Sequence, residues 1–125
     1  TCTVRVASNG RFEYRGVDSS CNPYLSVAAL LVAGLDGLRR ESDPGPPQEA
    51  NTYDLLQAHG EDSIERVPDS LGAALIELEK DQVLRDGALP GRLWRVFEHY
   101  KRDEWESYLA AVTDWERDQY LEVLP

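Results

Sequence analysis

Residues 11–38 read RFEYRGVDSSCNPYLSVAALLVAGLDGL, a short strand pattern that is followed by a long apolar helix pattern. Polar and apolar side chains alternate over 11–15, which is typical of a strand with one apolar face. Asn22 is a good helix N-cap, and Pro23 suits the first position of a helix. The centre of the helix pattern is apolar around its whole circumference. The sequence therefore predicts a helix over 22–40 that is buried on every side.

The residues before this stretch complete a β-hairpin over 1–16. A second alternating run, TVRVA, occupies residues 3–7. Asn9 and Gly10 lie between the two runs, and this dipeptide is a strong signal for a hairpin turn. The two strands are therefore expected to pair in an antiparallel way.

Two registers are compatible with this hairpin. A two-residue loop would pair Val6 with Glu13 and place Arg5 on the aromatic face of the sheet. A three-residue loop that ends in a left-handed glycine would pair Arg5 with Glu13 and Ala7 with Arg11. We favour the second register because it gathers the charged side chains on one face and leaves the aromatic side chains for the core.

The rest of the chain predicts a long, mostly irregular connection and then helices only. The connection contains the proline-rich run DPGPPQ, which cannot form a helix or a central strand. Helices are expected from Ser70, from Asp81 to Gly87, from Pro90 to about Val112, and from Trp115 to about Leu124 with Thr113 or Asp114 as cap. We therefore predict an α+β fold with a hairpin over 1–16, a buried helix over 22–40, a long loop over 42–69 and a set of helices over 70–125.

Composition narrows the class of protein. The 125 residues include 13 Lys and Arg against 23 Asp and Glu, a formal net charge of −10. Proteins that bind nucleic acid or anionic membranes usually carry the opposite sign, so neither partner is expected.

The longest apolar run is too short to cross a bilayer. Cys2 and Cys21 lack the spacing of a zinc site or a redox pair. Two free thiols suit a reducing, cytoplasmic location.

One group of residues in the hairpin suggests chemistry. The favoured register brings Arg5 onto the same face as Arg11, Glu13 and Arg15. Three arginines and one glutamate leave a local charge of +2 in an acidic protein. Such a cluster could bind a polyanion such as a nucleotide phosphate, and Glu13 could hold a divalent cation that bridges it. The alternative is a solvated strand face with cross-strand ion pairs and no ligand.

Two motifs resemble the C-terminal part of the glutamine synthetase family. They are GRFEYR at residues 10–15 and DSSCNPYLSVAALLVAGLDG at residues 18–37. In that family an R-x-E-x-R strand precedes an N-P-Y-L helix. The resemblance implies that the chain is the C-terminal portion of a catalytic domain. It also implies an ATP-dependent ligase that phosphorylates the γ-carboxylate of glutamate, after which ammonia or an amine displaces the phosphate. Mg²⁺ or Mn²⁺ and a ring of identical subunits are implied as well.

The resemblance assigns roles to five residues. Glu13 matches a metal-ligand glutamate of the family. Arg15 matches a catalytic arginine that faces the glutamate substrate and the transferred phosphoryl group. Arg5 and Arg11 match arginines that approach the ATP phosphates. Tyr53, in the segment NTYDL, matches a tyrosine that is adenylylated in some bacterial members, so it is a possible regulatory site.

The chain also departs from the family pattern. The link between the two strands is shorter than in the ammonia-using bacterial enzymes and lacks their lysine near the nucleotide. This trait is closer to the subgroup that includes γ-glutamylmethylamide synthetases, so the amine stays open. The other metal ligands of the family lie outside these residues, which predicts that the chain alone is inactive. A reading from another class is a non-catalytic interaction or scaffold domain.

Overall fold

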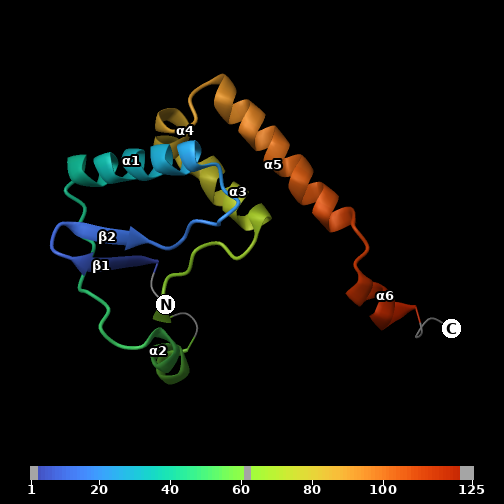
Figure 1. Cartoon of the computed structure of the whole chain (residues 1–125), viewed down its shortest axis with the longest axis horizontal. Coiled ribbons are helices and arrows are strands. Elements are labelled where there is room, and N and C mark those ends of the chain that lie inside the picture. Colours follow the sequence, from blue (N-terminus) through green and yellow to red (C-terminus); the bar gives the residue numbers. More distant parts are fainter. Residues whose placement is uncertain (1–2, 61–62, 122–125) are drawn as a thin grey trace.

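A computed structural model describes residues 3–60 and 63–121. A two-stranded antiparallel sheet precedes a series of helices, as Figure 1 shows. This arrangement confirms the predicted α+β class. The elements are β1 (Val4–Ser8), β2 (Arg11–Tyr14), α1 (Pro23–Arg39), α2 (Thr52–His59), α3 (Leu71–Lys80), α4 (Gln82–Gly87), α5 (Arg92–Ala110) and α6 (Asp114–Tyr120).

The register of the hairpin agrees with the favoured prediction at its centre. Arg5 lies opposite Glu13, Val4 lies opposite Tyr14, and Val6 lies opposite Phe12. Because side chains alternate along each strand, the charged residues share one face and the apolar residues share the other.

The turn of the hairpin differs from the prediction. Arg11 pairs with Ser8 and not with Ala7, and the irregularity lies in β1 between Val6 and Ser8. Gly10 has the expected positive φ of 73°. The loop between the strands therefore holds two residues. The extra residue, Ala7, is accommodated as a bulge in β1, which preserves the register of the residues before it.

The beginning of α1 follows its sequence signals. The side chain of Asn22 accepts hydrogen bonds from the backbone N–H groups of Tyr24 and Leu25 at 3.0 and 3.3 Å. Pro23 occupies the first turn, where its missing N–H leaves no intrahelical bond unmade. The predicted start of this helix is confirmed.

The predicted burial of α1 is wrong in this chain. None of the residues of α1 is buried. One face packs on α4, where a methyl group at Gly87 would lie 2.7 Å from Cγ1 of Val32. The opposite face stays exposed because no other element in the described ranges covers it broadly. The helix is as apolar as its sequence indicates, but within the described ranges only α4 packs on it extensively.

The segment 42–69 is less irregular than predicted, because it contains α2. Asn51 caps this helix by accepting a hydrogen bond from the backbone N–H of Tyr53 at 3.0 Å. Asp54 adds a favourable negative charge in the first turn. Helix α2 has only eight residues, which is too short for a clear apolar periodicity in the sequence. The helix was therefore not predicted.

The remaining helices lie close to their predicted positions. Ser70, Asp81 and Thr113 cap α3, α4 and α6 through their side-chain oxygens. Helix α5 ends at Ala110, slightly before the predicted end near Val112. The predicted end of the last helix near Leu124 lies outside the described residues, as does Cys2. Cys21 is a free, half-buried thiol.

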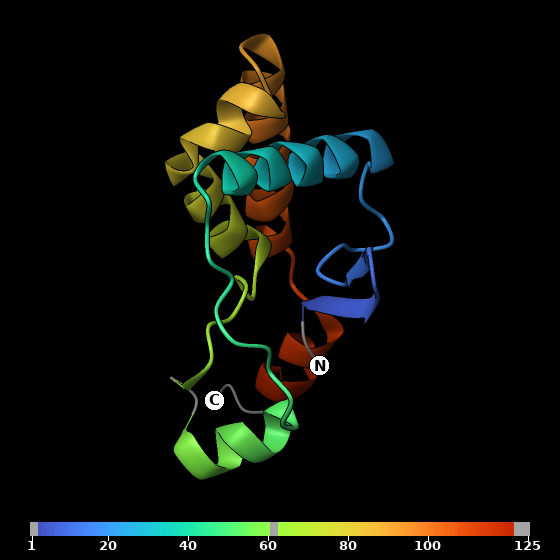
Figure 2. The ribbon, with the colours of Figure 1, turned by 90° about the vertical axis from the view of Figure 1, so that its left-hand side faces the viewer.

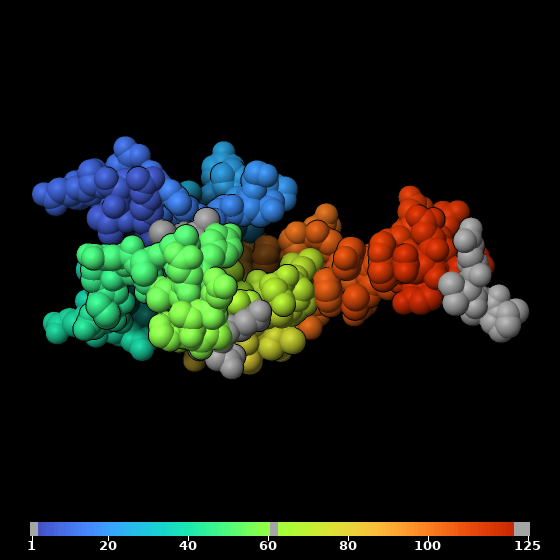
Figure 3. Space-filling view, turned by 90° about the horizontal axis from the view of Figure 1, so that it is seen from below, coloured from blue at the N-terminus to red at the C-terminus, as the bar shows by residue number. Residues whose placement is uncertain are grey.

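The core is small and lies among the helices. Its buried hydrophobic residues, within the described part of the chain, are Leu75, Ala88 and Leu89. Figure 2 shows α4 near the top of the view and α2 at the bottom. The hairpin lies at an intermediate height. Figure 3 shows α6 at the end of an extension that continues from α5. No helix in the described ranges is long and apolar enough to span a membrane.

Candidate active-site strand

The charged face of the hairpin brings three guanidinium groups to one carboxylate. Nη2 of Arg15 lies 3.1 Å from Oε2 of Glu13, and Nη2 of Arg11 lies 3.3 Å from Oε1. Nη1 of Arg5 approaches Oε2 from the neighbouring strand at 3.6 Å. The structure therefore assembles the four residues that the sequence proposed as a cluster.

Backbone pairing positions this cluster. The alternation of β2 places Arg11, Glu13 and Arg15 on one face, and the register brings Arg5 across from Glu13. The backbone N–H of Arg15 also donates to the carbonyl oxygen of Thr3 at 2.7 Å. This bond continues the antiparallel ladder beyond Tyr14 and fixes the backbone of Arg15.

The arginines keep Glu13 ionised. The hydrogen bond from Arg15 is the largest cause that lowers the pKa of Glu13 below its ordinary value of 4.5, and the charge of Arg5 and the hydrogen bond from Arg11 lower it further. Partial desolvation of the carboxyl opposes this effect. The side chain of Glu13 is 33% exposed, while the three arginine side chains are more exposed. The cluster is therefore open to a ligand from solvent.

The cluster suits an anion better than a metal ion held by this chain alone. Guanidinium groups bind phosphate and carboxylate oxygens through paired N–H donors. The carboxylate of Glu13 is an oxygen ligand of the kind that Mg²⁺ and Mn²⁺ prefer. No group of three or more His, Cys, Asp or Glu residues capable of holding a metal occurs in the described ranges. The carboxylate of Glu13 therefore has no pair of further candidate ligands beside it within the described ranges.

A hollow of about 620 Å³ adjoins the cluster at Arg15. Its lining combines the end of the hairpin with parts of the chain distant in sequence, namely Thr52 and Leu56 of α2 and the segment 64–69. The charged residues of that segment on the lining are Glu65, Arg66 and Asp69. The sequence did not predict that α2 and the segment 64–69 lie close to Arg15. A local sequence pattern does not indicate which distant segment packs beside the end of a strand.

Tyr53 stays apart from the arginine cluster. It lies in the first turn of α2 and is 67% exposed. It is not among the residues that line the hollow beside Arg15. Tyr53 is therefore exposed and lies outside the lining of that hollow.

The family model described as "Glutamine synthetase, catalytic domain" matches residues 1–120 of this chain. The chain belongs to the glutamine synthetase catalytic-domain family. The resemblance inferred from the two sequence motifs is confirmed, and the family is one of ligases.

Curated members of the glutamine synthetase family include relatives with two different names. The glutamine synthetase of Methanococcus maripaludis is 44% identical over 114 residues, which cover 90% of this chain and 25% of the relative. The glutamate–methylamine ligase of Methyloversatilis universalis shows the same identity and the same two coverages. The chain thus spans about a quarter of the length of these relatives.

Two solved structures share the fold of this chain. A GmaS complex with ADP superposes with a TM-score of 0.85 at 38% identity, covering 96% of this chain and 27% of the other. GmaS without ligand gives a TM-score of 0.83 at 39% identity and covers 97% and 28% of the two chains. The hairpin and helices therefore form part of a larger fold in these proteins.

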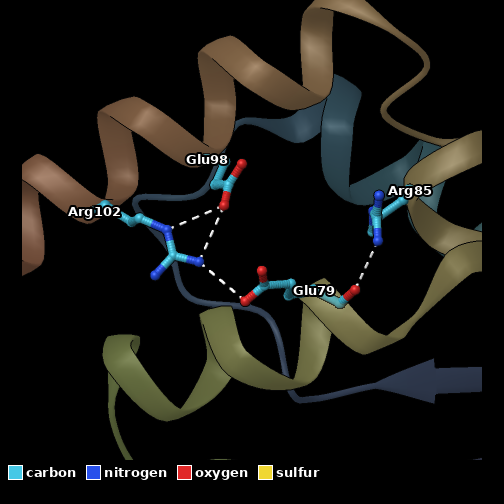
Figure 4. A network of polar contacts seen from close by, with 4 residues as sticks. All are labelled: Glu79, Arg85, Glu98 and Arg102. Atoms are coloured by element: carbon cyan, nitrogen blue, oxygen red, sulfur yellow. Dashed lines mark hydrogen bonds and ion pairs between the residues drawn. The ribbon is translucent and has the colours of Figure 1, made fainter.

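A second charged network joins three of the helices. Figure 4 shows Arg102 of α5 between Glu79 of α3 and Glu98 of α5, at 3.1 and 3.0 Å. Arg85 donates to the backbone carbonyl of Glu79 at 2.8 Å and stacks on Trp94, 5.0 Å from the ring centroid. Arg102 joins α3 to α5, and Arg85 joins α4 to α3 and α5, so these contacts fasten the three helices together.

A second hollow, between helices, is separate from the arginine cluster. It measures about 640 Å³ and lies between the start of α1 and the helices α4 and α5. Its walls are mostly apolar and include Leu25, Leu84 and Phe97. It has no concentration of titratable groups comparable to the hairpin, so we place the candidate chemistry at the hairpin.

Proposed function

We propose that this chain supplies the phosphoryl-binding strand of an ATP-dependent glutamate–ammonia or glutamate–amine ligase. The observation that carries the proposal is the convergence of Arg5, Arg11 and Arg15 on Glu13 in a chain of the glutamine synthetase family. The reaction would form γ-glutamyl phosphate from ATP and glutamate. Ammonia or an amine would then displace the phosphate to give glutamine or a γ-glutamyl amide.

Each residue of the cluster has a role that suits its chemistry. Arg15 binds the transferred phosphoryl group and the glutamate substrate, since its planar fork offers two parallel N–H donors. Arg5 and Arg11 neutralise the phosphates of ATP. Glu13 supplies one oxygen ligand to Mg²⁺ or Mn²⁺, which when bound would neutralise phosphate charge during transfer. Catalysis by this strand is thus electrostatic and positional.

The geometry of Arg15 supports its assignment to the reacting group. A guanidinium has five N–H donors, and the hydrogen bond to Glu13 uses only part of that capacity. The same side chain borders the 620 Å³ hollow. Arg15 can therefore hold Glu13 and an entering anion at the same time.

The remaining components of the site come from outside these residues. The chain spans 25% of the length of its relatives, and Glu13 is one ligand of an incomplete set. We assign the segment to the C-terminal part of the catalytic domain. The rest of that domain and identical subunits in a ring, in the cytoplasm, complete the site. The isolated chain is expected to be inactive, because an acyl phosphate exposed to water would hydrolyse.

Methylamine is a specific alternative to ammonia. The relative named glutamate–methylamine ligase is as identical to this chain as the relative named glutamine synthetase, at 44%. The short link between β1 and β2 also favours the methylamine-using subgroup. The enzyme would then be a γ-glutamylmethylamide synthetase. The arginine strand serves both reactions, because they share the phosphorylation of glutamate and differ only in the attacking amine.

Tyr53 is proposed as a regulatory site of lower priority. Its exposed position on α2 permits adenylylation of the hydroxyl. Mass spectrometry of the protein from nitrogen-replete cells tests this role. Unmodified Tyr53 peptide as the sole species would reject it.

The decisive experiment assays the protein that contains this segment together with the rest of its catalytic chain. Purified enzyme is incubated with ATP, glutamate and Mg²⁺ or Mn²⁺, and separately with ammonia, methylamine and ethylamine. Phosphate release together with a γ-glutamyl product supports the ligase, and the preferred amine identifies the subgroup. A folded protein that gives no γ-glutamyl product with any amine would contradict the ligase and favour the interaction or scaffold role.

A further inference from the structure

Gly16 directly follows Arg15, and two side chains pack closely against it. A methyl group added at Gly16 would lie 2.8 Å from Oη and 3.0 Å from Cζ of Tyr14, and 3.1 Å from Cγ2 of Thr3. Carbon atoms in favourable contact are separated by about 3.5 to 4.0 Å. Any side chain at position 16 would therefore require Tyr14 or Thr3 to move.

The backbone conformation does not explain the glycine at this position. The glycines with a positive φ in the described ranges are Gly10, Gly45, Gly60 and Gly91. Gly16 is not among them, so it does not occupy the left-handed region that favours glycine. What distinguishes Gly16 is the space that its missing side chain leaves for Tyr14 and Thr3.

The same two neighbours hold the backbone of Arg15. The backbone N–H of Arg15 donates to the carbonyl oxygen of Thr3 at 2.7 Å, so a displacement of Thr3 would disturb this bond. Tyr14 immediately precedes Arg15 and pairs with Val4 across the hairpin. Arg15 and Gly16 both line the hollow of about 620 Å³. The close packing at Gly16 therefore lies where Arg15 would meet an entering anion.

We propose that Gly16 is a positioning residue for Arg15. Because Gly16 has no side chain, Tyr14 and Thr3 close against the chain just beyond β2, and this packing sets the direction in which the Arg15 guanidinium extends. The inference rests on the proposed function, since it concerns the arginine that we assign to the transferred phosphoryl group. A misplacement of about 1 Å near a reacting group can lower a rate by about 10²-fold.

Gly16→Ala tests this role in the protein that contains this segment together with the rest of its catalytic chain. We expect kcat to fall by about tenfold or more and KM for ATP to change by less than about twofold, because Arg15 is assigned to the reacting group. A crystal structure of the variant should show the guanidinium carbon of Arg15 displaced by about 1 Å relative to the unaltered enzyme.

Gly72→Ala is the matched control. A methyl group at Gly72 also meets a close neighbour, at 2.5 Å from Nε1 of Trp105, but Gly72 lies on α3 and outside the arginine cluster. This variant should unfold at a lower temperature and keep its kcat when assayed below that temperature. A loss of packing by itself would thus be separated from a loss of positioning.

Two double variants show through which residues Gly16 acts. In an Arg15→Lys background, Gly16→Ala should lower the residual turnover by less than about twofold, because the arginine that it positions is absent. In a Tyr14→Val background, which removes the ring beside Gly16, Gly16→Ala should lose most of its effect for the corresponding reason.

A normal kcat or an unmoved Arg15 guanidinium in Gly16→Ala would overturn the proposal. So would an undiminished effect of Gly16→Ala in the Arg15→Lys background. A Gly16→Ala chain that fails to fold, with or without Tyr14→Val, would assign Gly16 to the stability of the fold and would also overturn it. Normal turnover in Arg15→Lys, or no γ-glutamyl product from the unaltered enzyme, would instead contradict the proposed function.

Discussion

Arg15 and Glu13 lie two residues apart on β2 and its extension, and Nη2 of the arginine donates to Oε2 of the glutamate at 3.1 Å. The arginine that we assign to the transferred phosphoryl group is thus held by the carboxylate that we assign to the metal. Changing either residue should affect the chemistry more than the fold, because both are accessible to solvent and contribute no apolar burial.

Glu13→Gln should reduce turnover of the full-length enzyme by on the order of 10²-fold or more, because it keeps the shape of the side chain and removes its charge. Thermal unfolding should change little. The control is Glu77→Gln, which removes another exposed ion-paired carboxylate, 2.7 Å from Lys80, and should leave turnover unchanged. Normal turnover in Glu13→Gln would end the assignment of this strand to the active site.

Arg15→Lys should also be severely impaired in the full-length enzyme. Lysine keeps the positive charge but loses the planar fork that binds two oxygens at once. We expect kcat to fall more than the affinity for ATP, because Arg15 is assigned to the reacting group. Arg39→Lys on α1, outside the cluster, is the control. An Arg15→Lys enzyme with wild-type kcat would show that charge alone is needed at this position.

The titration of Glu13 gives a prediction for pH. Its pKa is lowered in the folded chain, chiefly by the hydrogen bond from Arg15. The ion pairs of Glu13 therefore contribute stability above the unfolded pKa of about 4.5, and that contribution is lost as the pH falls through the lower folded value. Carbon-detected NMR of the Glu13 carboxyl should give a midpoint below 4.5 that rises in Arg15→Gln. A midpoint at or above 4.5 would contradict the ion-paired cluster.

A pair of glycine substitutions tests the helix packing. A methyl group at Gly72 of α3 would lie 2.5 Å from Nε1 of Trp105 on α5. Gly72→Ala should therefore destabilise the chain by about 1 to 3 kcal/mol through overpacking. At Gly34 in α1 nothing lies within 4 Å of the added methyl, so Gly34→Ala should stabilise the helix by about 0.5 to 1 kcal/mol. Urea denaturation measures both; a stabilising Gly72→Ala would contradict the packing of α3 on α5.

Features that depend on neighbouring residues in the sequence could be predicted, and features that depend on distant residues could not. Asn22 and Pro23 determine the start of α1 through their own backbone geometry, and the structure follows them. The pairing of Arg5 with Glu13 was predicted because charge segregation decides between two registers. The burial of α1 depends on what covers it, and no residue of the helix encodes that. The proximity of α2 to Arg15 is likewise a long-range contact without a local pattern.

Because of the bulge at Ala7, the number of residues near the turn does not determine how the charged residues pair. Val6 still faces Phe12 on one side of the bulge, and Ser8 faces Arg11 on the other. Loss of the extra residue would restore a regular ladder without moving Arg5 relative to Glu13. Related hairpins can therefore gain or lose a residue near the turn while the four charged side chains keep their partners. The number of residues in the connection can therefore change without a change in the pairing of Arg5 with Glu13.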